Sequence, residues 1–222
     1  MTLERMPARM LAMRHDSPHA EVLHPLDPRQ FAADPLVQFE RWYALANEAA
    51  VAEPDAMALA TATPDGRPSL RWVLFKGIVR GGFSFYTHYR SRKGGDLAAN
   101  PRAALGFYWE PLGRQVRVEG SVERLPAADS DAYFRTRPPG SRLSAAISPQ
   151  SQVIPDRLEL ERRVAELETR HPHGDIPRPE DWGGYRVTPD AIEFWQQRPN
   201  RLHDRLRYVR GAEAWRLERL AP

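Results

Sequence analysis

The spacing of hydrophobic residues predicts a helix and then a hairpin in the first third of the chain. Asp34-Pro35 supplies an N-cap and a first-turn proline, and apolar residues from Leu36 to Leu45 recur at helical spacing. The pattern then changes to short apolar runs. Met57–Thr63 and Ser69–Lys76 flank Pro64-Asp65-Gly66, which is typical of a turn, so the two runs are predicted to pair as antiparallel strands.

The same reasoning extends through the rest of the chain. The next predicted elements are a strand over Phe83–His88, a helix over Arg92–Ala99 and a hairpin of Ala103–Trp109 with Arg114–Leu125. In the last of these strands valines alternate with polar residues, which is typical of a strand with one buried face. The remaining predictions are helices over Pro126–Arg137 and Asp156–Arg170, and three short strands over Gly184–Thr188, Ala191–Gln196 and Leu206–Leu217.

These elements favour an α+β fold that is mainly β. Six or seven mostly antiparallel strands with short helices point to a small barrel with peripheral helices. We expect residues 31–222 to form one domain, because no repeat or low-complexity tract divides them. Residues 1–30 are polar, rich in proline and without periodicity, and they are predicted to be a flexible arm.

Composition excludes several classes of function. With 222 residues and 41% hydrophobic side chains the chain can build a core, and without cysteine it has no disulfide, thiolate metal ligand or cysteine nucleophile. No apolar run reaches the ~20 residues of a membrane span, and the N-terminus lacks the apolar stretch of a signal peptide. We therefore expect a cytoplasmic protein that does not bind membranes. A net charge of +3 gives little support for nucleic-acid binding, and His171-Pro-His173 lacks a third metal ligand.

Positive charge is concentrated between Gly66 and Gly95, where seven cationic side chains and no carboxylate occur. Two of them, Arg71 and Lys76, fall on opposite faces of a straight strand. One could therefore reach a cofactor phosphate and the other a substrate phosphate. The alternative is an edge strand that is protected by charge.

A second candidate anion site is Ser91-Arg92-Lys93 at a helix start. Its serine N-cap, its backbone N–H groups and its two cations could hold a phosphate, although a solvated helix start is the alternative. Tyr133 and Arg137 lie four residues apart on one helix face, and Ser141 follows a turn whose glycine lets the backbone approach closely. These three residues form a further set that is compatible with an anion. On a polar strand face, Gln115 could pair with the edge of a heterocycle.

Near the C-terminus Arg201, His203 and Arg205 alternate, so they would share one face of an extended segment. Three cationic or near-cationic groups on one face would repel one another unless an anion or an electron-rich ring neutralised them. The sequence contains no glycine-rich phosphate loop and no Gly-x-Ser-x-Gly motif. Phosphate recognition is therefore expected to depend on side chains and a helix start.

In series, these motifs resemble the FMN-dependent pyridoxine/pyridoxamine 5′-phosphate oxidase family from about Asp34 to Pro222. The segments that carry the resemblance are Arg71–Lys76, Phe85-Tyr86-Thr87, Ser91-Arg92-Lys93, Arg114-Gln115-Val116, Tyr133–Ser141, Gln150-Ser151, Trp182-Gly183-Gly184, Glu193–Trp195, Arg201–Arg205 and Arg219–Pro222. The resemblance implies a split, Greek-key-like β-barrel and a homodimer with FMN in clefts between the subunits. It also implies a C-terminal dimerisation region over residues 178–222.

The resemblance assigns roles to positions of this sequence. FMN contacts are expected at Arg71, Trp72, Val73, Leu74, Phe75, Lys76, Tyr86, Thr87, Arg92, Lys93, Gln115, Gln150, Ser151, Trp195 and Arg205. Substrate-phosphate contacts are expected at Lys76, Tyr133, Arg137 and Ser141. Arg201 and His203 match the catalytic residues that lie against the pyridine ring, and no metal is expected. The family's N-terminal Arg-x-x-Tyr-like stretch, which folds over the substrate, is matched here only by Arg14.

The implied reaction oxidises pyridoxine or pyridoxamine 5′-phosphate to pyridoxal 5′-phosphate. O₂ is the final acceptor, hydrogen peroxide is a product, and the amine substrate also releases ammonia. The alternatives are a split-barrel FMN oxidase for a phenazine-type substrate, a non-catalytic protein that binds FMN or pyridoxal phosphate, and an RNA-binding module. The complete substrate-phosphate set argues against the first alternative, and the presence of Arg201 and His203 argues against the second.

Overall fold

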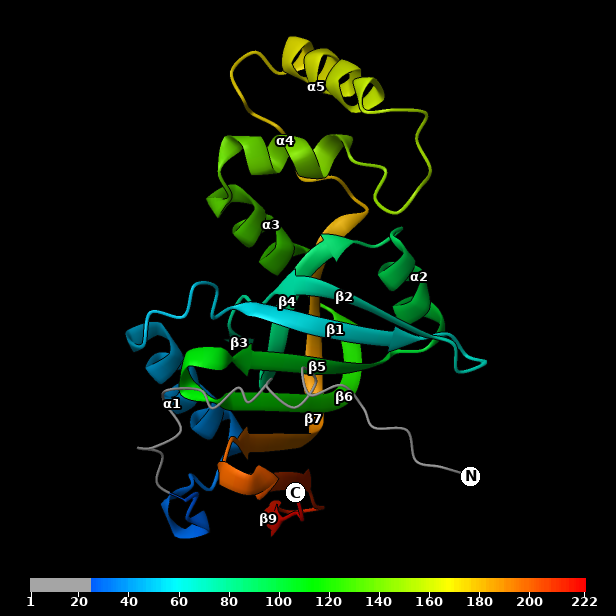
Figure 1. Cartoon of the computed structure of the whole chain (residues 1–222). Coiled ribbons are helices and arrows are strands. Elements are labelled where there is room, and N and C mark those ends of the chain that lie inside the picture. Colours follow the sequence, from blue (N-terminus) through cyan, green and yellow to red (C-terminus); the bar gives the residue numbers. More distant parts are fainter. Residues whose placement is uncertain (1–24) are drawn as a thin grey trace, which may run out of the picture.

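The computed structural model describes residues 25–222, which form an antiparallel sheet flanked by helices (Figure 1). The strands are β1 (Ala56–Ala62), β2 (Pro68–Leu74), β3 (Ile78–Val79), β4 (Gly82–His88), β5 (Arg102–Trp109), β6 (Arg114–Arg124), β7 (Trp182–Gln196), β8 (Asp204–Arg210) and β9 (Trp215–Arg219). The α-helices are α1 (Pro35–Glu48), α2 (Arg92–Ala99), α3 (Ala127–Thr136), α4 (Pro139–Ile147) and α5 (Leu158–Arg170). Short 3₁₀ turns occur at η2 (Pro28–Gln30), η3 (Glu110–Leu112) and η4 (Pro199–Arg201).

The sheet curls into a small barrel. Its strands follow the order β2-β1-β5-β6-β7-β4-β3, all pairings among the described strands are antiparallel, and β8 and β9 extend the sheet beyond β7. Beyond the end of β2, the Lys76 N–H donates to the Ser84 carbonyl (2.8 Å) and the Ser84 N–H donates to the Gly77 carbonyl (3.0 Å). These bonds join the chain after β2 to β4. The mainly β, antiparallel barrel that the sequence predicts is confirmed.

Cap residues set the start of two helices that carry site or core residues. Asp34 caps α1 by accepting a hydrogen bond from the Leu36 N–H (2.8 Å). The Ser91 hydroxyl oxygen caps α2 by accepting from the Gly94 N–H (3.4 Å). Both helices begin where the sequence predicts, because a side-chain cap is a local signal that needs no tertiary contact.

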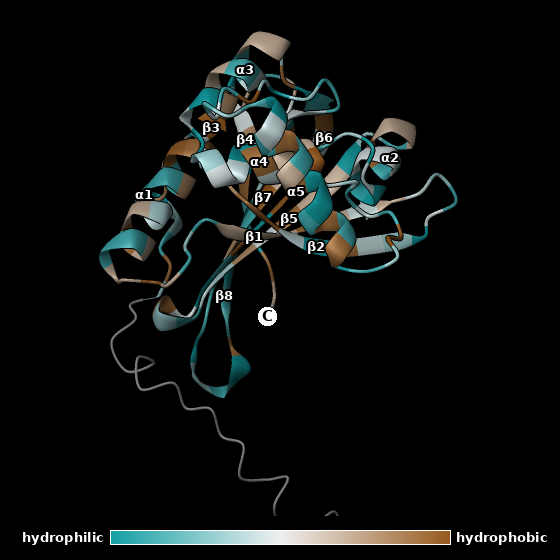
Figure 2. Ribbon diagram, turned by 90° about the horizontal axis from the view of Figure 1, so that it is seen from above, coloured by the Kyte–Doolittle hydropathy of each residue, from teal (hydrophilic) through white to brown (hydrophobic). Residues whose placement is uncertain are grey.

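The hydrophobic core fills the barrel and the space beneath α1. Phe39 of α1 has no exposed surface, and its ring centroid lies 4.7 Å from that of Phe83 and 5.0 Å from that of Phe107. Trp42, one turn further along the helix, packs edge-on against Phe194 of β7 at 5.1 Å. Figure 2 shows hydrophobic colours in the middle of the molecule, around β4 and β7, and hydrophilic colours on projecting loops. The aromatic face of α1 therefore holds the helix against the barrel.

The prediction of separate strands over Gly184–Thr188 and Ala191–Gln196 is wrong. β7 continues through Pro189, which pairs with Gly120 at the point where the β6–β7 register shifts. A proline cannot donate a ladder hydrogen bond, but it is tolerated at such an irregularity. The segment Leu206–Leu217 forms the hairpin β8–β9. The resulting long β7 connects the two ends of the molecule (Figure 1).

Helix α4 replaces the turn that the sequence predicts before Ser141. Pro139 is its first residue, a position where the missing N–H of proline is harmless, and the Ser141 N–H donates to the Pro138 carbonyl (3.0 Å). Two prolines and a glycine favour a turn locally, but here they begin a helix. In Figure 1, α3, α4 and α5 form a group beyond one end of the barrel.

Residues 1–24, and with them Arg14, lie outside the described residues. The last residues of the predicted arm, 25–30, contact the body of the protein. Leu26 is 8% exposed, its N–H donates to the Asp204 carboxylate (3.2 Å) and its carbonyl accepts from Arg219 (2.6 Å). The packed body therefore begins before residue 31. None of the helices within 25–222 has the length and apolar character that crossing a membrane requires.

Candidate active site

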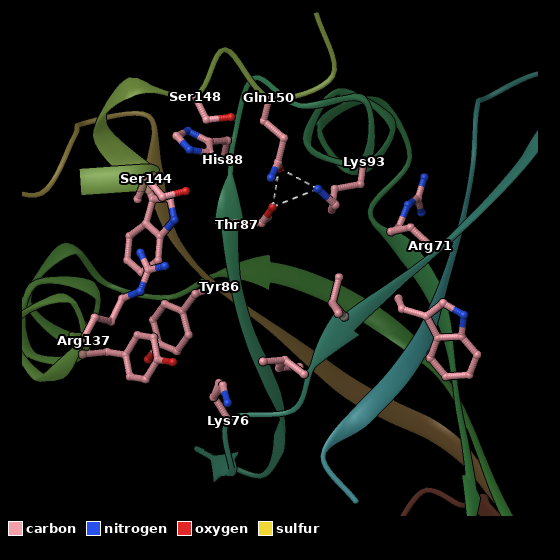
Figure 3. A pocket seen from close by; sticks show the side chains of 16 residues that line it. Arg71, Lys76, Tyr86, Thr87, His88, Lys93, Arg137, Ser144, Ser148 and Gln150 are labelled. Carbon is pink, nitrogen blue, oxygen red and sulfur yellow. Dashed lines mark hydrogen bonds between the residues drawn. The ribbon is translucent and has the colours of Figure 1, made fainter. Parts of the chain in front are cut away.

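A cavity of about 510 Å³ lies between β2, β4 and the helices α2, α3 and α4 (Figure 3). The predicted site residues that line it are Arg71, Trp72, Val73, Leu74, Lys76, Tyr86, Thr87, Lys93, Tyr133, Arg137 and Gln150. The other lining residues are His88, Ser144, Ala145, Ser148 and Trp182. The fold therefore brings together, from distant parts of the chain, four of the cations that the sequence singles out: Arg71, Lys76, Lys93 and Arg137.

Lys93, in the first turn of α2, is a buried cation with no carboxylate partner among residues 25–222. Its Nζ donates to Gln150 Oε1 (2.7 Å), Thr87 Oγ1 (2.9 Å) and Ser91 Oγ (3.2 Å). The residue is 8% exposed, and burial, together with the charge of Arg71, lowers the pKa of Lys93 to about 8. We call Lys93, Thr87 and Gln150 the inner end of the cavity (Figure 3). An anion bound there would supply the missing countercharge.

Arg71 is held in place by hydrogen bonds from its guanidinium group. It donates to Ser69 Oγ (2.7 Å), Thr61 Oγ1 (2.8 Å) and the Leu59 carbonyl (3.0 Å), and the Asp96 carboxylate lies 3.6 Å away. Burial lowers the pKa of Arg71, and the charge of Asp96 opposes part of that shift. The side chain is thus positioned before a ligand binds.

Arg137 lies across the cavity from Lys93, over a group of stacked rings (Figure 3). The rings of Tyr86 and Tyr133 stack at 3.9 Å, and the Trp182 ring is parallel to that of Tyr133 within 5°. The Arg137 guanidinium carbon lies 4.7 Å from the Trp182 ring centroid. Burial lowers the pKa of Arg137, and its Nη1 is buried without a hydrogen-bond partner among the described residues. A stacked guanidinium with a free donor is suited to binding an oxyanion.

Lys76 differs from Lys93 because a carboxylate already neutralises it. Its Nζ donates to Asp55 Oδ2 at 2.9 Å, and each of the two side chains is 27% exposed. We call this ion pair the rim of the cavity. Figure 3 shows Lys76 and Arg71 on different sides of one cavity, and Lys76 lies beyond the end of β2, so strand parity does not set its position.

Four further predicted residues gather near the other end of β7. Gln115, Trp195 and Arg205 are direct neighbours across β6, β7 and β8, and the His203 ring lies 4.5 Å from that of Trp195. None of the four lines the cavity. β7 begins at the cavity with Trp182, and Trp195 lies up to roughly 40 Å further along, at about 3.3 Å per residue of a straight strand.

Arg201 and His203 do not share the extended segment that the sequence predicts. Pro199 begins the turn η4, and both Asn200 and Arg201 have left-handed φ angles, of 56° and 60°. His203 Nδ1 accepts a hydrogen bond from the Arg198 N–H (3.1 Å), so its Nε2 carries the proton of the neutral ring. Burial and the charge of Arg201 lower the pKa of His203. Left-handed backbone at two adjacent non-glycine residues is frequent at functional sites.

The predicted repulsion among these C-terminal cations is relieved for Arg205, which has a carboxylate partner within the chain. Arg205 donates to both carboxylate oxygens of Glu193 (2.7 and 3.1 Å), and this pairing raises the pKa of Arg205. We call Gln115, Trp195, Arg201, His203 and Arg205 the C-terminal cluster. On one chain most of the predicted residues thus form two groups, the cavity and the C-terminal cluster.

Comparisons with known proteins bear on the family and the fold of this chain. The family model described as pyridoxamine 5′-phosphate oxidase matches residues 46–171, which is more than half of the chain. The chain belongs to the pyridoxamine 5′-phosphate oxidase family. A second model, described as the pyridoxine 5′-phosphate oxidase C-terminal dimerisation region, matches residues 182–222.

Curated members of this family bear the name pyridoxine/pyridoxamine 5′-phosphate oxidase. The relative from Rubrobacter xylanophilus is 58% identical over 189 residues, which are 85% of this chain and 87% of the relative. The relative from Salinibacter ruber is 56% identical over 192 residues, 85% of this chain and 89% of the relative.

Two solved structures show the same fold. PhzG from Burkholderia lata 383, in complex with tetrahydrophenazine-1-carboxylic acid, has a TM-score of 0.85 and 37% identity, and the match covers 92% of this chain and 100% of that one. A pyridoxamine 5′-phosphate oxidase-related, FMN-binding protein from Nostoc punctiforme has a TM-score of 0.67 and 20% identity, over 89% and 98% of the two chains. The split barrel expected for the family is confirmed.

Several positions that the family resemblance assigns to ligand contacts lie outside the cavity of a single chain. Phe75 is part of the core with 5% exposure, whereas Arg92 and Ser151 are exposed. Ser141 lies on α4 but not in the cavity lining. For these residues a ligand contact stays a prediction.

Sequence reasoning gave no site role to four polar or aromatic residues of the cavity lining, although Trp182 stands in a segment that carries the family resemblance. Ser144 and Ser148 escaped because α4 was not recognised. His88 is the last residue of β4, and no sequence motif marks it. Burial lowers the pKa of its ring. Trp182 had a detectable signal in the two glycines that follow it, since a Cβ at Gly184 would lie 2.8 Å from the Tyr86 ring.

Proposed function

We propose that this protein oxidises pyridoxine 5′-phosphate and pyridoxamine 5′-phosphate to pyridoxal 5′-phosphate, with FMN as cofactor and O₂ as final electron acceptor. The observation that carries the proposal is a pair of cations across one cavity, in which Lys93 is buried and Arg137 is half-buried with its Nη1 atom fully buried. Neither has a carboxylate partner within residues 25–222, and Arg137 has a free donor. Two phosphate-bearing ligands, a flavin and a vitamin B6 compound, would satisfy both.

The inner end fits the phosphate of FMN. Lys93 offers a positive charge, Thr87 offers a hydroxyl group, and Arg71 is already fixed by its own hydrogen bonds. A charge-assisted hydrogen bond to a phosphate contributes about 1.5–3 kcal/mol where water is excluded. When bound, FMN would supply the redox chemistry by taking two electrons from the substrate and passing them to O₂, which forms hydrogen peroxide.

The substrate phosphate fits the side of the cavity that carries Arg137, Tyr133 and Lys76. Arg137 can donate from its unpartnered Nη1 while its guanidinium plane stays on the Trp182 ring. This arrangement fixes the direction of the donor, which positions the substrate as well as binding it. Ser141 belongs to the same proposed set because of its family position.

A second copy of the chain is proposed to complete each active site. The C-terminal cluster contains Arg201 and His203, but it lies away from the cavity of its own chain. In a two-fold dimer each cavity can receive the cluster of the other chain. The exposed apolar residues Leu70 (66%), Trp72 (66%) and Leu74 (45%) beside the cavity support a covered surface, as does the match of residues 182–222 to a dimerisation region.

Within the completed site, Arg201 is proposed to stabilise negative charge on the pyridine 3-oxygen. His203, neutral because its pKa is lowered, is proposed to donate from Nε2 and orient the ring. Co-expression of Lys93→Met and Arg201→Met chains tests the shared site. Each variant alone should be nearly inactive. In a co-expressed mixture about half of the dimers are mixed, and each mixed dimer contains one intact site of two. The mixture should therefore recover about a quarter of the activity of the unaltered protein. Complete inactivity of the mixed dimers would contradict a site built from two chains.

The absorption spectrum of the purified protein tests the proposed reaction. We expect flavin bands that bleach when pyridoxamine 5′-phosphate is added without O₂. Pyridoxal 5′-phosphate and ammonia should form together with the bleaching, and air should then restore the bands and yield hydrogen peroxide. Protein that binds no FMN, or flavin bands that neither vitamer bleaches, would refute the proposal.

A phenazine-type oxidase is the second candidate, because the PhzG complex contains tetrahydrophenazine-1-carboxylic acid and shares 37% identity with this chain. That ligand carries a carboxylate and no phosphate. Lys76, Tyr133 and Arg137 all line the cavity here, which favours a phosphorylated substrate. The same anaerobic experiment with tetrahydrophenazine-1-carboxylic acid separates the candidates, since the favoured proposal predicts no bleaching by this compound.

A further inference from the structure

A carboxylate stands beside the lysine that is proposed to hold the substrate phosphate. Asp55 Oδ2 lies 2.9 Å from Lys76 Nζ, within hydrogen-bond distance. Asp55 itself does not line the cavity, so it affects a ligand there through its ion pair with Lys76. A carboxylate in this position opposes the binding of a phosphate dianion, because it neutralises the cation and repels the ligand.

The backbone on both sides of this ion pair is anchored. The Asp55 carbonyl accepts a hydrogen bond from the Phe75 N–H (2.8 Å), and the Lys76 N–H donates to the Ser84 carbonyl (2.8 Å). Asp55 directly precedes β1, and Lys76 follows β2, which pairs with β1. The main chain thus places the two residues side by side, at the end of the β1–β2 pairing and at the bonds that join the chain after β2 to β4.

The other cations of the cavity provide a contrast. Lys93 donates only to neutral oxygen atoms, and Arg137 keeps an unpartnered Nη1. The Asp96 carboxylate stays 3.6 Å from the Arg71 guanidinium, beyond a close hydrogen bond. Among the described lysines and arginines of the cavity lining, Lys76 thus has the closest carboxylate.

We infer that Asp55 is a specificity-determining residue that weakens the hold on the phosphate of substrate and product. The inference rests on the proposed function. Lys76 has three donor hydrogens, so a phosphate can bind while Asp55 remains in place. The ligand then meets an ion pair that is nearly neutral instead of a full positive charge. The consequence is a higher KM and a faster release of the phosphorylated product, while FMN at the inner end is unaffected.

Steady-state kinetics of the FMN-loaded Asp55→Asn enzyme tests this inference. Asparagine keeps the size of the side chain and an oxygen that accepts from Lys76, but it removes the charge. We expect the KM for pyridoxamine 5′-phosphate and the inhibition constant of pyridoxal 5′-phosphate to fall together by about 5- to 20-fold. The kcat should stay the same or fall, because slower product release can limit turnover. Inhibition by pyridoxal, which lacks the phosphate, should not change.

The matched control is Asp190→Asn. This change removes a carboxylate that pairs with Arg102 at 2.6 Å, and neither residue lines the cavity. We expect its kinetic constants to equal those of the unaltered enzyme. A common decrease in both variants would assign the effect to net charge and overturn the inference.

Two further outcomes are decisive. An Asp55→Asn enzyme that turns over with unchanged KM and unchanged product inhibition overturns the inference and leaves the proposed function intact. If the unaltered protein oxidises neither vitamer, the proposed function fails instead. The increase in melting temperature on adding inorganic phosphate then tests the role of Asp55. A larger increase for Asp55→Asn than for the unaltered protein would support that role. Equal increases would overturn it.

Discussion

The two lysines of the cavity, Lys93 at the inner end and Lys76 at the rim, show how one cavity can hold two anions differently. Lys93 is buried and donates only to hydroxyl and amide oxygens, whereas Lys76 is partly exposed and paired with Asp55. Burying an unpaired cation costs free energy, and a bound anion recovers it. The inner end is therefore suited to a cofactor that stays bound, and the rim to a substrate phosphate that must leave.

Of the changes that test this comparison, removing the charge of Lys93 should have the largest effect. Lys93→Met is expected to weaken FMN binding by about 30- to 100-fold, because a charge-assisted phosphate contact is lost. The FMN-free variant should unfold at a higher temperature than the unaltered FMN-free protein, since an unpaired buried charge is gone. Flavin-fluorescence titration and thermal melting measure the two effects. Arg90→Met, in the exposed turn before α2, is the control and should change neither quantity.

Arg137→Met should separate the substrate phosphate from that of FMN. We expect the KM for pyridoxamine 5′-phosphate to rise by about 10- to 30-fold, because the free donor of Arg137 is lost. FMN affinity should change by less than about twofold, since the inner end is untouched. Arg135→Met, an exposed residue of the same helix, is the control. Equal losses of FMN and substrate affinity in Arg137→Met would mean that one anion site serves both ligands.

The pH dependence of FMN binding should follow Lys93. Burial lowers the pKa of Lys93 in the FMN-free protein to about 8, and a bound dianion favours the charged form. FMN affinity should therefore be greatest below this value and about tenfold weaker near pH 9.5. Titrations of the unaltered protein should show this decrease, and those of Lys93→Met should not. A pH-independent affinity of the unaltered protein would exclude Lys93 as the responsible group.

A smaller effect is expected on the stability of the FMN-free protein. The pKa of Lys93 is about 8 in the folded state and 10.5 as its ordinary value, so between these values the unfolded chain binds more protons. The contribution of Lys93 to the free energy of unfolding therefore rises with pH in this window. The stability advantage of Lys93→Met over the unaltered protein should shrink as the pH is raised through it. Urea unfolding of both proteins at several pH values measures the difference.

Of the inner end of the cavity, Lys93 was within reach of the sequence because its signals are local, whereas Thr87 and Gln150 came from the family resemblance. Ser91 predicted the N-cap that starts α2, and Lys93 two residues later was predicted to meet an anion. The rim was also accessible in principle, since the predicted hairpin of β1 and β2 brings Asp55 near Lys76. Asp55 was overlooked because an acidic residue before a strand resembles an ordinary turn.

The remaining features depend on tertiary structure. Pro189 interrupts the sequence pattern of β7, but the register shift opposite Gly120 lets the strand continue. Only that continuity shows that Trp182 and Trp195 lie at opposite ends of one strand, so that the cavity and the C-terminal cluster are separate on one chain. Helix α4 begins with residues that locally favour a turn. Resemblance to a family supplied most of the site positions. The fold shows which of them line the cavity and which belong to the C-terminal cluster.

The most direct test of two separate anion sites is a calorimetric titration of pyridoxal 5′-phosphate into the FMN-loaded protein and into the FMN-free protein. This product cannot turn over, so binding alone is measured. We predict that one pyridoxal 5′-phosphate binds per chain while FMN remains bound, and that Lys93→Met leaves this affinity unchanged where FMN is saturating. Displacement of FMN by pyridoxal 5′-phosphate, in proportion to its concentration, would contradict the account.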